Sequence, residues 1–214
     1  FLSRPRRFGK SLLISTLEAY YQGKKELFEG LAIEQLETEW NEHAVLHLDL
    51  NAEDYSEIEG LRNGLELQLR SWEKVYGTSE EGLSYSGRFM QVIKEAYRQT
   101  GRGVVVLIDE YDVPLENAYH EGFYDDMTNL IRSCFESALK TNPSLEFAVL
   151  TGCLRVSRES IFTGLNNLKT YSITKNKFSQ YFGFTQEEMK GILQTFSLEQ
   201  YAGTIAKWYD GYRF

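Results

Sequence analysis

Apolar and polar positions follow two different periods along this chain, and the two periods predict alternating strands and helices. Short runs of apolar, often β-branched residues are typical of strands that a parallel sheet buries on both faces. They lie at 44–50, 103–108 and 146–150, with a strand end at 1–3 and a short strand near 170–174. Longer stretches with apolar residues at helical spacing predict helices. These stretches are 11–21, 31–41, 57–76, 85–100, 122–141, 186–195 and 198–209.

The order of these elements predicts an α/β fold, in which helices cover both faces of a parallel sheet. Right-handed crossovers place the carboxyl ends of all strands along one edge, and we expect the functional site there. We expect a core domain over 1–175 whose first strand is incomplete. A helical segment over 176–214 is expected to lead to a further domain.

Composition and charge exclude several classes of protein. The chain has 214 residues, 42% hydrophobic and 25% charged, as in ordinary soluble domains. It has no run of about 18 apolar residues, so we expect no membrane span. Cys134 and Cys153 are expected to be buried core thiols in a reducing compartment, which favours a cytoplasmic protein. The net charge of −8 disfavours direct binding of nucleic acid.

A basic segment lies between the first strand and the first helix, where phosphate-binding loops occur. Its residues are Arg4, Pro5, Arg6, Arg7, Phe8, Gly9, Lys10 and Ser11. The free N–H groups and positive dipole of a helix start attract phosphate. Lys10 is expected to reach the β- and γ-phosphates of a nucleotide, and Ser11 to bind Mg²⁺. Arg4 stands where such loops usually have glycine, and a positive φ there would be strained.

Two carboxylates follow the most apolar strand and complete the pattern. Asp109 is a candidate Mg²⁺ ligand, and Glu110 a candidate general base for an attacking water. The alternative is that these acids only end the strand and cap the next helix. The acidic pair and the basic loop, in this order and about 100 residues apart, favour a nucleotide site over that alternative.

Another strand end carries polar groups after residue 150. Thr151 is a candidate sensor of the γ-phosphate, and Arg155 an alternative anion contact. An ordinary turn is the competing interpretation. Arg213 is a further candidate phosphate contact, although its aromatic neighbours favour packing of the last helix.

Taken together, these segments resemble the AAA-ATPase-like family of bacterial P-loop ATPases, which is related to archaeal-type and STAND-like ATPases. The resemblance rests on FLSRPRRFGKS (1–11), LIDEYDVPL (107–115), LTG (150–152), SIFTGLNNL (160–168), FGFT (182–185) and WYDGYRF (208–214). Members of that family are similar to this chain in having Arg in place of the first loop glycine. The resemblance implies a P-loop NTPase fold of the additional-strand type, with ATP and Mg²⁺ as ligands. It also implies that a PD-(D/E)XK nuclease-like domain follows the last of these segments.

We therefore interpret the chain as an ATP-binding and ATP-hydrolysing domain. Lys10, Glu110 and Thr151 are the candidate catalytic residues, and Ser11 and Asp109 the candidate metal ligands. A non-hydrolysing nucleotide switch is the first alternative. A basic nucleic-acid contact for a fused nuclease-like domain is the second, and the acidic charge disfavours it. Self-association through Arg6 and Arg7 is a further possibility that the sequence leaves open.

Overall fold

The computed structural model describes residues 1–77, 82–153, 168–172 and 177–209. Its centre is a four-stranded sheet in which all paired strands run parallel. The strands are β1 (Leu2–Ser3), β2 (Val45–Asp49), β3 (Val104–Asp109) and β4 (Leu145–Gly152). Their spatial order is β1-β4-β3-β2, so β4 is inserted between the strand before the loop and the strand before the acidic pair. The predicted α/β fold of the additional-strand type is confirmed.

Most helices agree closely with the apolar periodicity. They are α1 (Lys10–Tyr21), α2 (Ala32–Leu36), α3 (Ile58–Tyr76), α4 (Tyr85–Thr100), α5 (Val113–Glu121), α6 (Tyr124–Leu139), α7 (Gln186–Thr195) and α8 (Ala202–Tyr209). Short 3₁₀ turns cover Lys25–Phe28, Ser179–Tyr181 and Glu199–Tyr201. The helix expected over 31–41 stops early, because Glu37 is extended and Trp40 packs on Phe28 instead.

Helix α5 is absent from the sequence prediction. It has only nine residues, and Pro114 lies in its first turn. Proline is well tolerated in a first helical turn, where its missing N–H would have no partner. Leu115 and Ala118 are fully buried and fix this short helix against the core.

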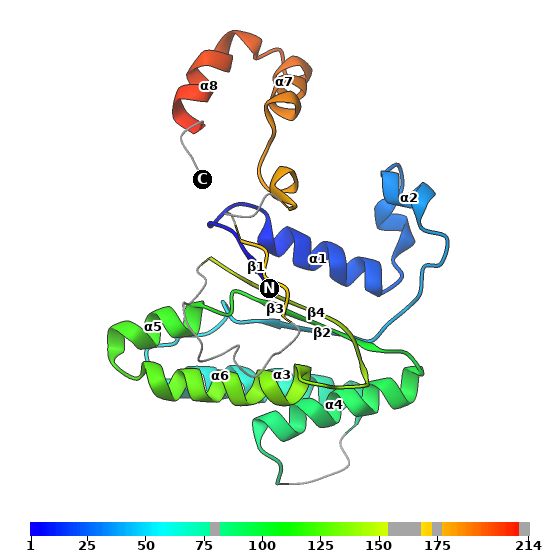
Figure 1. Cartoon of the computed structure of the whole chain (residues 1–214), viewed down its shortest axis with the longest axis vertical. Helices are drawn as coiled ribbons and strands as arrows, with labels where there is room; N and C mark the ends of the chain where they lie inside the picture. The colour runs from blue at the N-terminus through cyan, green and yellow to red at the C-terminus, as the bar shows by residue number, and fades with distance from the viewer. Residues whose placement is uncertain (78–81, 154–167, 173–176, 210–214) are drawn as a thin grey trace.

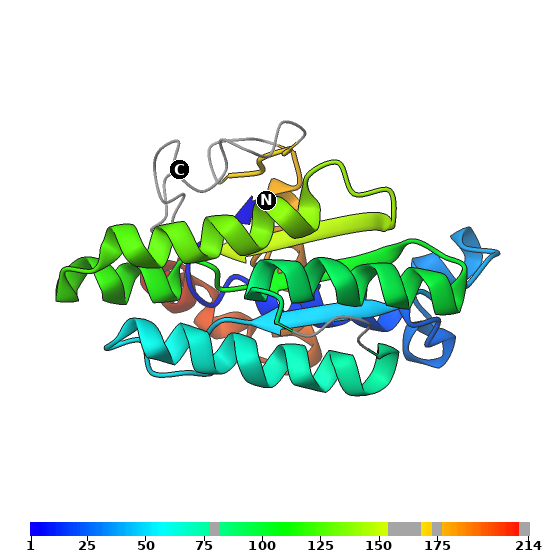
Figure 2. The same ribbon diagram turned by 90° about the horizontal axis from the view of Figure 1, so that it is seen from below.

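The sheet is the middle layer of three. Helix α1 covers one face, and α3, α4, α5 and α6 cover the other (Figure 1). Viewed from below, the long helices α3, α4 and α6 lie next to one another across that face (Figure 2). Val105 and Leu107 of β3 pack on Ile14 of α1, and the alternate residues of β3 belong to the larger core on the other side. Every residue of β3 is buried, as its continuous apolar run predicted.

Beyond β1, the strand expected near 170–174 is represented in the described residues by a single parallel bridge between Leu2 and Tyr171. The remainder of that range, from residue 173, lies outside the described residues. Helices α7 and α8 project away from the sheet, beyond the side covered by α1 (Figure 1). The expected boundary at 175–176 stays a prediction. None of the described helices combines the length and the apolar character that a membrane span requires.

The strand register decides which residues meet at the carboxyl edge. Asp49 pairs with Asp109, and Leu2 and Ser3 pair with Thr151 and Gly152. The polar strand ends are therefore aligned side by side, at the same edge from which the loop 4–9 leads into α1.

Candidate functional site

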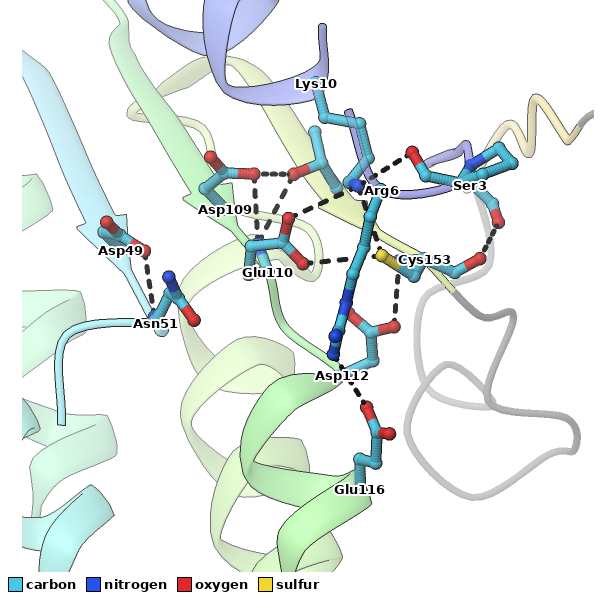
Figure 3. A network of polar contacts seen from close by, with 12 residues as sticks. Ser3, Arg6, Lys10, Asp49, Asn51, Asp109, Glu110, Asp112, Glu116 and Cys153 are labelled. Carbon is cyan, nitrogen blue, oxygen red and sulfur yellow. Dashed lines mark hydrogen bonds and ion pairs between the residues drawn. The ribbon is translucent and has the colours of Figure 1, made fainter. Parts of the chain in front are cut away.

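The carboxyl edge of the sheet brings four predicted residues into one polar network. Lys10, at the first turn of α1, points at Glu110, which follows β3 (Figure 3). Asp109 and Thr151 lie beside them at the ends of β3 and β4. Residues about 100 positions apart in sequence are thus in contact, as the order of the two motifs predicted.

The loop turns sharply before α1 begins. Gly9 is the N-cap residue with a φ of +77°, in the left-handed region that glycine occupies without strain. A Cβ at Gly9 would meet no atom within 4 Å, so the backbone conformation and not crowding favours glycine there. No side chain caps α1, and its first turn has no acidic residue. Its first N–H groups therefore face the site together with the positive end of the helix dipole.

Lys10 is held by three groups of the protein. Its side chain is buried, with 4% of the residue exposed. Its Nζ lies 3.3 Å from Glu110 Oε1 and donates to Cys153 Sγ at 3.2 Å and to the Pro5 carbonyl at 3.4 Å. Burial disfavours the charged form, but the hydrogen bond to Cys153 and the charge of Glu110 outweigh it and raise the pKa of Lys10. The ammonium group is therefore a fixed positive charge at this edge.

The acidic pair is shaped by a backbone turn. Glu110 has a φ of +53°, which is uncommon for a residue with a side chain. Asp109 Oδ1 accepts hydrogen bonds from the Glu110 N–H at 3.1 Å and from the Thr151 hydroxyl. Because Asp109 and Thr151 are both buried, this contact fixes the orientation of the carboxylate. Positive φ in non-glycine residues is frequent at functional sites, where the surroundings stabilise it.

The Arg4 side chain points away from the site, unlike that of Lys10. It is buried and points back into the protein, where Nη1 donates to the Ser3 carbonyl at 2.8 Å and to the Tyr171 carbonyl at 3.3 Å. The strain expected at Arg4 is absent, because the positive φ of the loop occurs at Arg7 (+69°) and Gly9. The left-handed turn of this loop thus lies at residues 7 and 9.

The remaining loop residues surround the site more loosely. Arg6 is exposed and lies 3.6 Å from Glu116 of α5. Arg7, Gly9 and Ser11 are also exposed, Ser11 in the first turn of α1. The loop therefore presents backbone groups and two exposed cations, Arg6 and Arg7, above the buried Lys10, Asp109 and Thr151.

Two residues of the network were not predicted. Asp112 is buried, and its Oδ2 accepts the Cys153 N–H at 2.8 Å. Gly152, which precedes Cys153, has no room for a side chain, since a Cβ there would lie 2.5 Å from Asp112 Oδ1. The expectation of a buried core thiol is correct for Cys134 and wrong for Cys153, which is half-buried at the site. The sequence signal that could have placed Cys153 at the site is its position directly after the polar end of β4.

Some candidates lie outside the described residues. These are Arg155, Arg213, the range 160–167 and the range 210–214. Their predicted roles stay predictions.

Comparison with known proteins places the chain in a family. A family model described as "Predicted AAA-ATPase" matches residues 1–162, which include the loop, the acidic pair and Thr151. A relative from Azotobacter chroococcum mcd 1, described as an uncharacterized protein in the vnfD 5′ region, is 30% identical over 216 residues. The alignment covers 100% of this chain and 42% of the relative, so the chain spans less than half of that protein. No solved structure matches.

Proposed function

The chain belongs to the AAA-ATPase-like family, and from this premise we propose that it binds Mg-ATP and hydrolyses it at the carboxyl edge of the sheet. Family membership points to an ATP-binding NTPase domain. The finer assignment, with a phosphate site at residues 4–11 and reactive groups at Asp109 and Glu110, is our proposal.

One observation carries the proposal: the buried Lys10 ammonium is 3.3 Å from the Glu110 carboxylate. A buried cation at an uncapped helix start suits phosphate oxygens, which accept hydrogen bonds and prefer the positive end of the helix dipole. Glu110 now provides the negative charge that Lys10 requires. Phosphate groups of a nucleotide would compete for the same ammonium, and the carboxylate would be released toward the reacting phosphate.

The oxygen donors at this edge suit magnesium. Mg²⁺ prefers oxygen ligands and is usually held by one or two protein groups together with phosphates and water. Asp109 supplies a carboxylate that Thr151 orients, and Ser11 supplies a hydroxyl in the first turn of α1. When bound, the ion neutralises charge on the transferred phosphoryl group. Asp109 and Ser11 are the protein's proposed ligands; the part of the chain that the structure describes has no group of three or more His, Cys, Asp and Glu residues that could hold a metal ion.

Glu110 is proposed to orient the attacking water and accept its proton. A general base must come within hydrogen-bond reach of that proton, and the side chain of Glu110 is only partly buried beside Lys10. The hydrogen bonds that the Glu110 N–H donates to Asp109 and Thr151 fix its backbone relative to the metal ligand. Most of the catalytic effect in phosphoryl transfer comes from such positioning and from fixed charge.

Calorimetric titration of the intact protein with Mg-ATP tests the binding site. Lys10→Ala is expected to weaken binding by about thirtyfold or more, because loss of a buried charged contact costs ~2–5 kcal/mol. Lys94→Ala is the matched control, since Lys94 is an exposed lysine of α4 on the far face of the sheet. Equal affinity in wild type and Lys10→Ala would refute the proposed site.

Glu110→Gln tests hydrolysis separately from binding. We expect turnover to fall by about a hundredfold or more, with Mg-ATP affinity retained or increased, because the competing ion pair with Lys10 is lost. A wild type that binds Mg-ATP without turning it over would instead support the non-hydrolysing switch.

A further inference from the structure

Arg4 connects the loop to a segment far away in sequence. Its guanidinium carbon lies 4.8 Å from the centre of the Phe182 ring, a cation–π distance. The same guanidinium group donates to the Ser3 and Tyr171 carbonyls. Arg4 is buried, with 3% of its surface exposed, and cation–π contacts are strongest where water is excluded. The first residue of the loop is therefore fixed from the side of the C-terminal segment.

A second contact joins the same two segments. A Cβ placed on Gly183 would lie 3.4 Å from Cε1 of Phe8, so the Phe8 ring lies beside this glycine. Gly183 has a φ of +83°, a conformation that favours glycine independently of space. Arg4 and Phe8 of the loop thus lie next to two consecutive residues, Phe182 and Gly183.

A capped helix start directly follows the turn that makes these contacts. Thr185 caps α7, and its side chain and that of Glu188 form a reciprocal capping box. Between the capping residue and the contacting pair lies Phe184, which is 71% exposed. The two phenylalanines on either side of Gly183 therefore differ: Phe182 contacts Arg4 of the loop, and Phe184 faces solvent.

We propose that the turn Phe182–Gly183 is a positioning element for the nucleotide loop, acting through Arg4 and Phe8. Arg4 then contributes to nucleotide binding by fixing the loop's start and not by contacting phosphate. The inference rests on the proposed function for its effect on ATP, and it adds a residue outside the family-matched range 1–162. A loop ordered in advance binds its ligand more tightly, because less entropy is lost on binding.

The first test measures, in the absence of nucleotide, how well ordered the loop is. Limited trypsin digestion of the intact protein, followed by mass spectrometry, measures cleavage after the exposed Arg6 and Arg7. Phe182→Ala is expected to accelerate this cleavage, and Phe184→Ala, the matched control, to leave it unchanged. Phe182→Tyr retains an aromatic face and is expected to restore the wild-type rate. Equal cleavage in wild type and Phe182→Ala would overturn the inference, whatever the protein binds.

The second test reads the consequence for ATP. Mg-ATP affinity should fall about tenfold in Phe182→Ala and stay within about twofold in Phe184→Ala and Phe182→Tyr, a tenfold change being ~1.4 kcal/mol. Phe182→Leu preserves most of the packing if Phe182→Ala unfolds, and melting temperatures identify that case. In a double-mutant cycle with Arg4→Gln, the two effects should be less than additive.

The possible outcomes separate the two proposals. A wild type that does not bind Mg-ATP refutes the proposed function, and the digestion still decides whether the turn orders the loop. A wild type that binds, with unchanged affinity in Phe182→Ala and additive effects in the cycle, refutes the positioning role alone. A lower melting temperature with unchanged affinity and unchanged cleavage after Arg6 and Arg7 would show that Phe182 is only structural.

Discussion

The two cysteines lie in regions with opposite properties. Cys134, on α6, is surrounded by the apolar core beneath the sheet, and burial raises its pKa to about 12. Cys153 directly follows β4, and its Sγ lies 3.2 Å from the Lys10 ammonium and 3.8 Å from Glu110 Oε2. The Cys134 thiol therefore packs as an apolar group in the core, whereas the Cys153 thiol lies between the charged side chains of Lys10 and Glu110.

This difference shows how the molecule separates stability from chemistry. The core beneath the sheet is filled by apolar side chains of α3, α4 and α6, and the loss of any one leaves a void. At the carboxyl edge, buried polar groups such as Asp109 and Thr151 satisfy one another. The apolar core thus stabilises the fold through packing, whereas the carboxyl edge holds polar groups in place through hydrogen bonds.

Thiol chemistry should give the largest contrast between the two regions. Alkylation requires the thiolate, so a pKa of about 12 in place of 9.0 slows Cys134 about a thousandfold at neutral pH, while the partly exposed Cys153 reacts. Iodoacetamide labelling followed by mass spectrometry checks this, with protein unfolded in urea as the control in which both react. Comparable labelling of the two thiols in the folded protein would contradict the assignment of Cys134 to a dry core.

The same pKa shift predicts a pH dependence of stability. The unfolded Cys134 thiol ionises near 9.0, whereas the folded thiol keeps its proton to about 12. Between these values the unfolded chain binds fewer protons, so the free energy of unfolding falls as pH rises. Cys134→Ala should remove this contribution in urea titrations across that window.

Packing should give the next largest effect. Ile131→Ala in α6 is expected to lower the free energy of unfolding by ~2–5 kcal/mol, because Ile131 is buried in the core and its truncation leaves a cavity. Val75→Ala is the control, since Val75 is exposed and surface changes usually stay within ~0.5 kcal/mol. Urea denaturation of the three proteins measures both values. A loss below ~1 kcal/mol in Ile131→Ala would mean that the core relaxes around the gap.

Most of the fold was predictable because its signals are local or periodic. The buried run of β3 and the amphipathic periods of α3, α4 and α6 identified the sheet and its cover. The order of the loop and the acidic pair then indicated where the strands' carboxyl ends meet. Helix α5 escaped prediction because nine residues that include a proline carry too little periodic signal.

The site was predictable in part, for a related reason. Lys10, Asp109, Glu110 and Thr151 follow strand ends or begin a helix, so their meeting follows from the sheet register. The inward direction of Arg4 and the contact with Phe182 do not follow from any spacing, because they join segments about 180 residues apart. Cys153 was assigned by residue type and local context, and Asp112 was not singled out, whereas the contacts of both come from neighbours across the site.

The exposed side of the loop should give the smallest effect. Arg6 is 75% exposed and pairs with Glu116 at 3.6 Å, so Arg6→Ala is expected to change stability by less than ~0.5 kcal/mol. If Arg6 also attracts the phosphates, Mg-ATP affinity should fall about twofold at low ionic strength and be unchanged at about 0.5 M salt, where exposed charges are screened. Calorimetry at both salt concentrations measures the difference. Arg98→Ala is the matched control, because Arg98 of α4 is 72% exposed and pairs with Glu95 away from the loop. A loss that persists at high salt would contradict a screened, long-range role and would place the Arg6 guanidinium in direct contact with the nucleotide, as Lys10 is proposed to be.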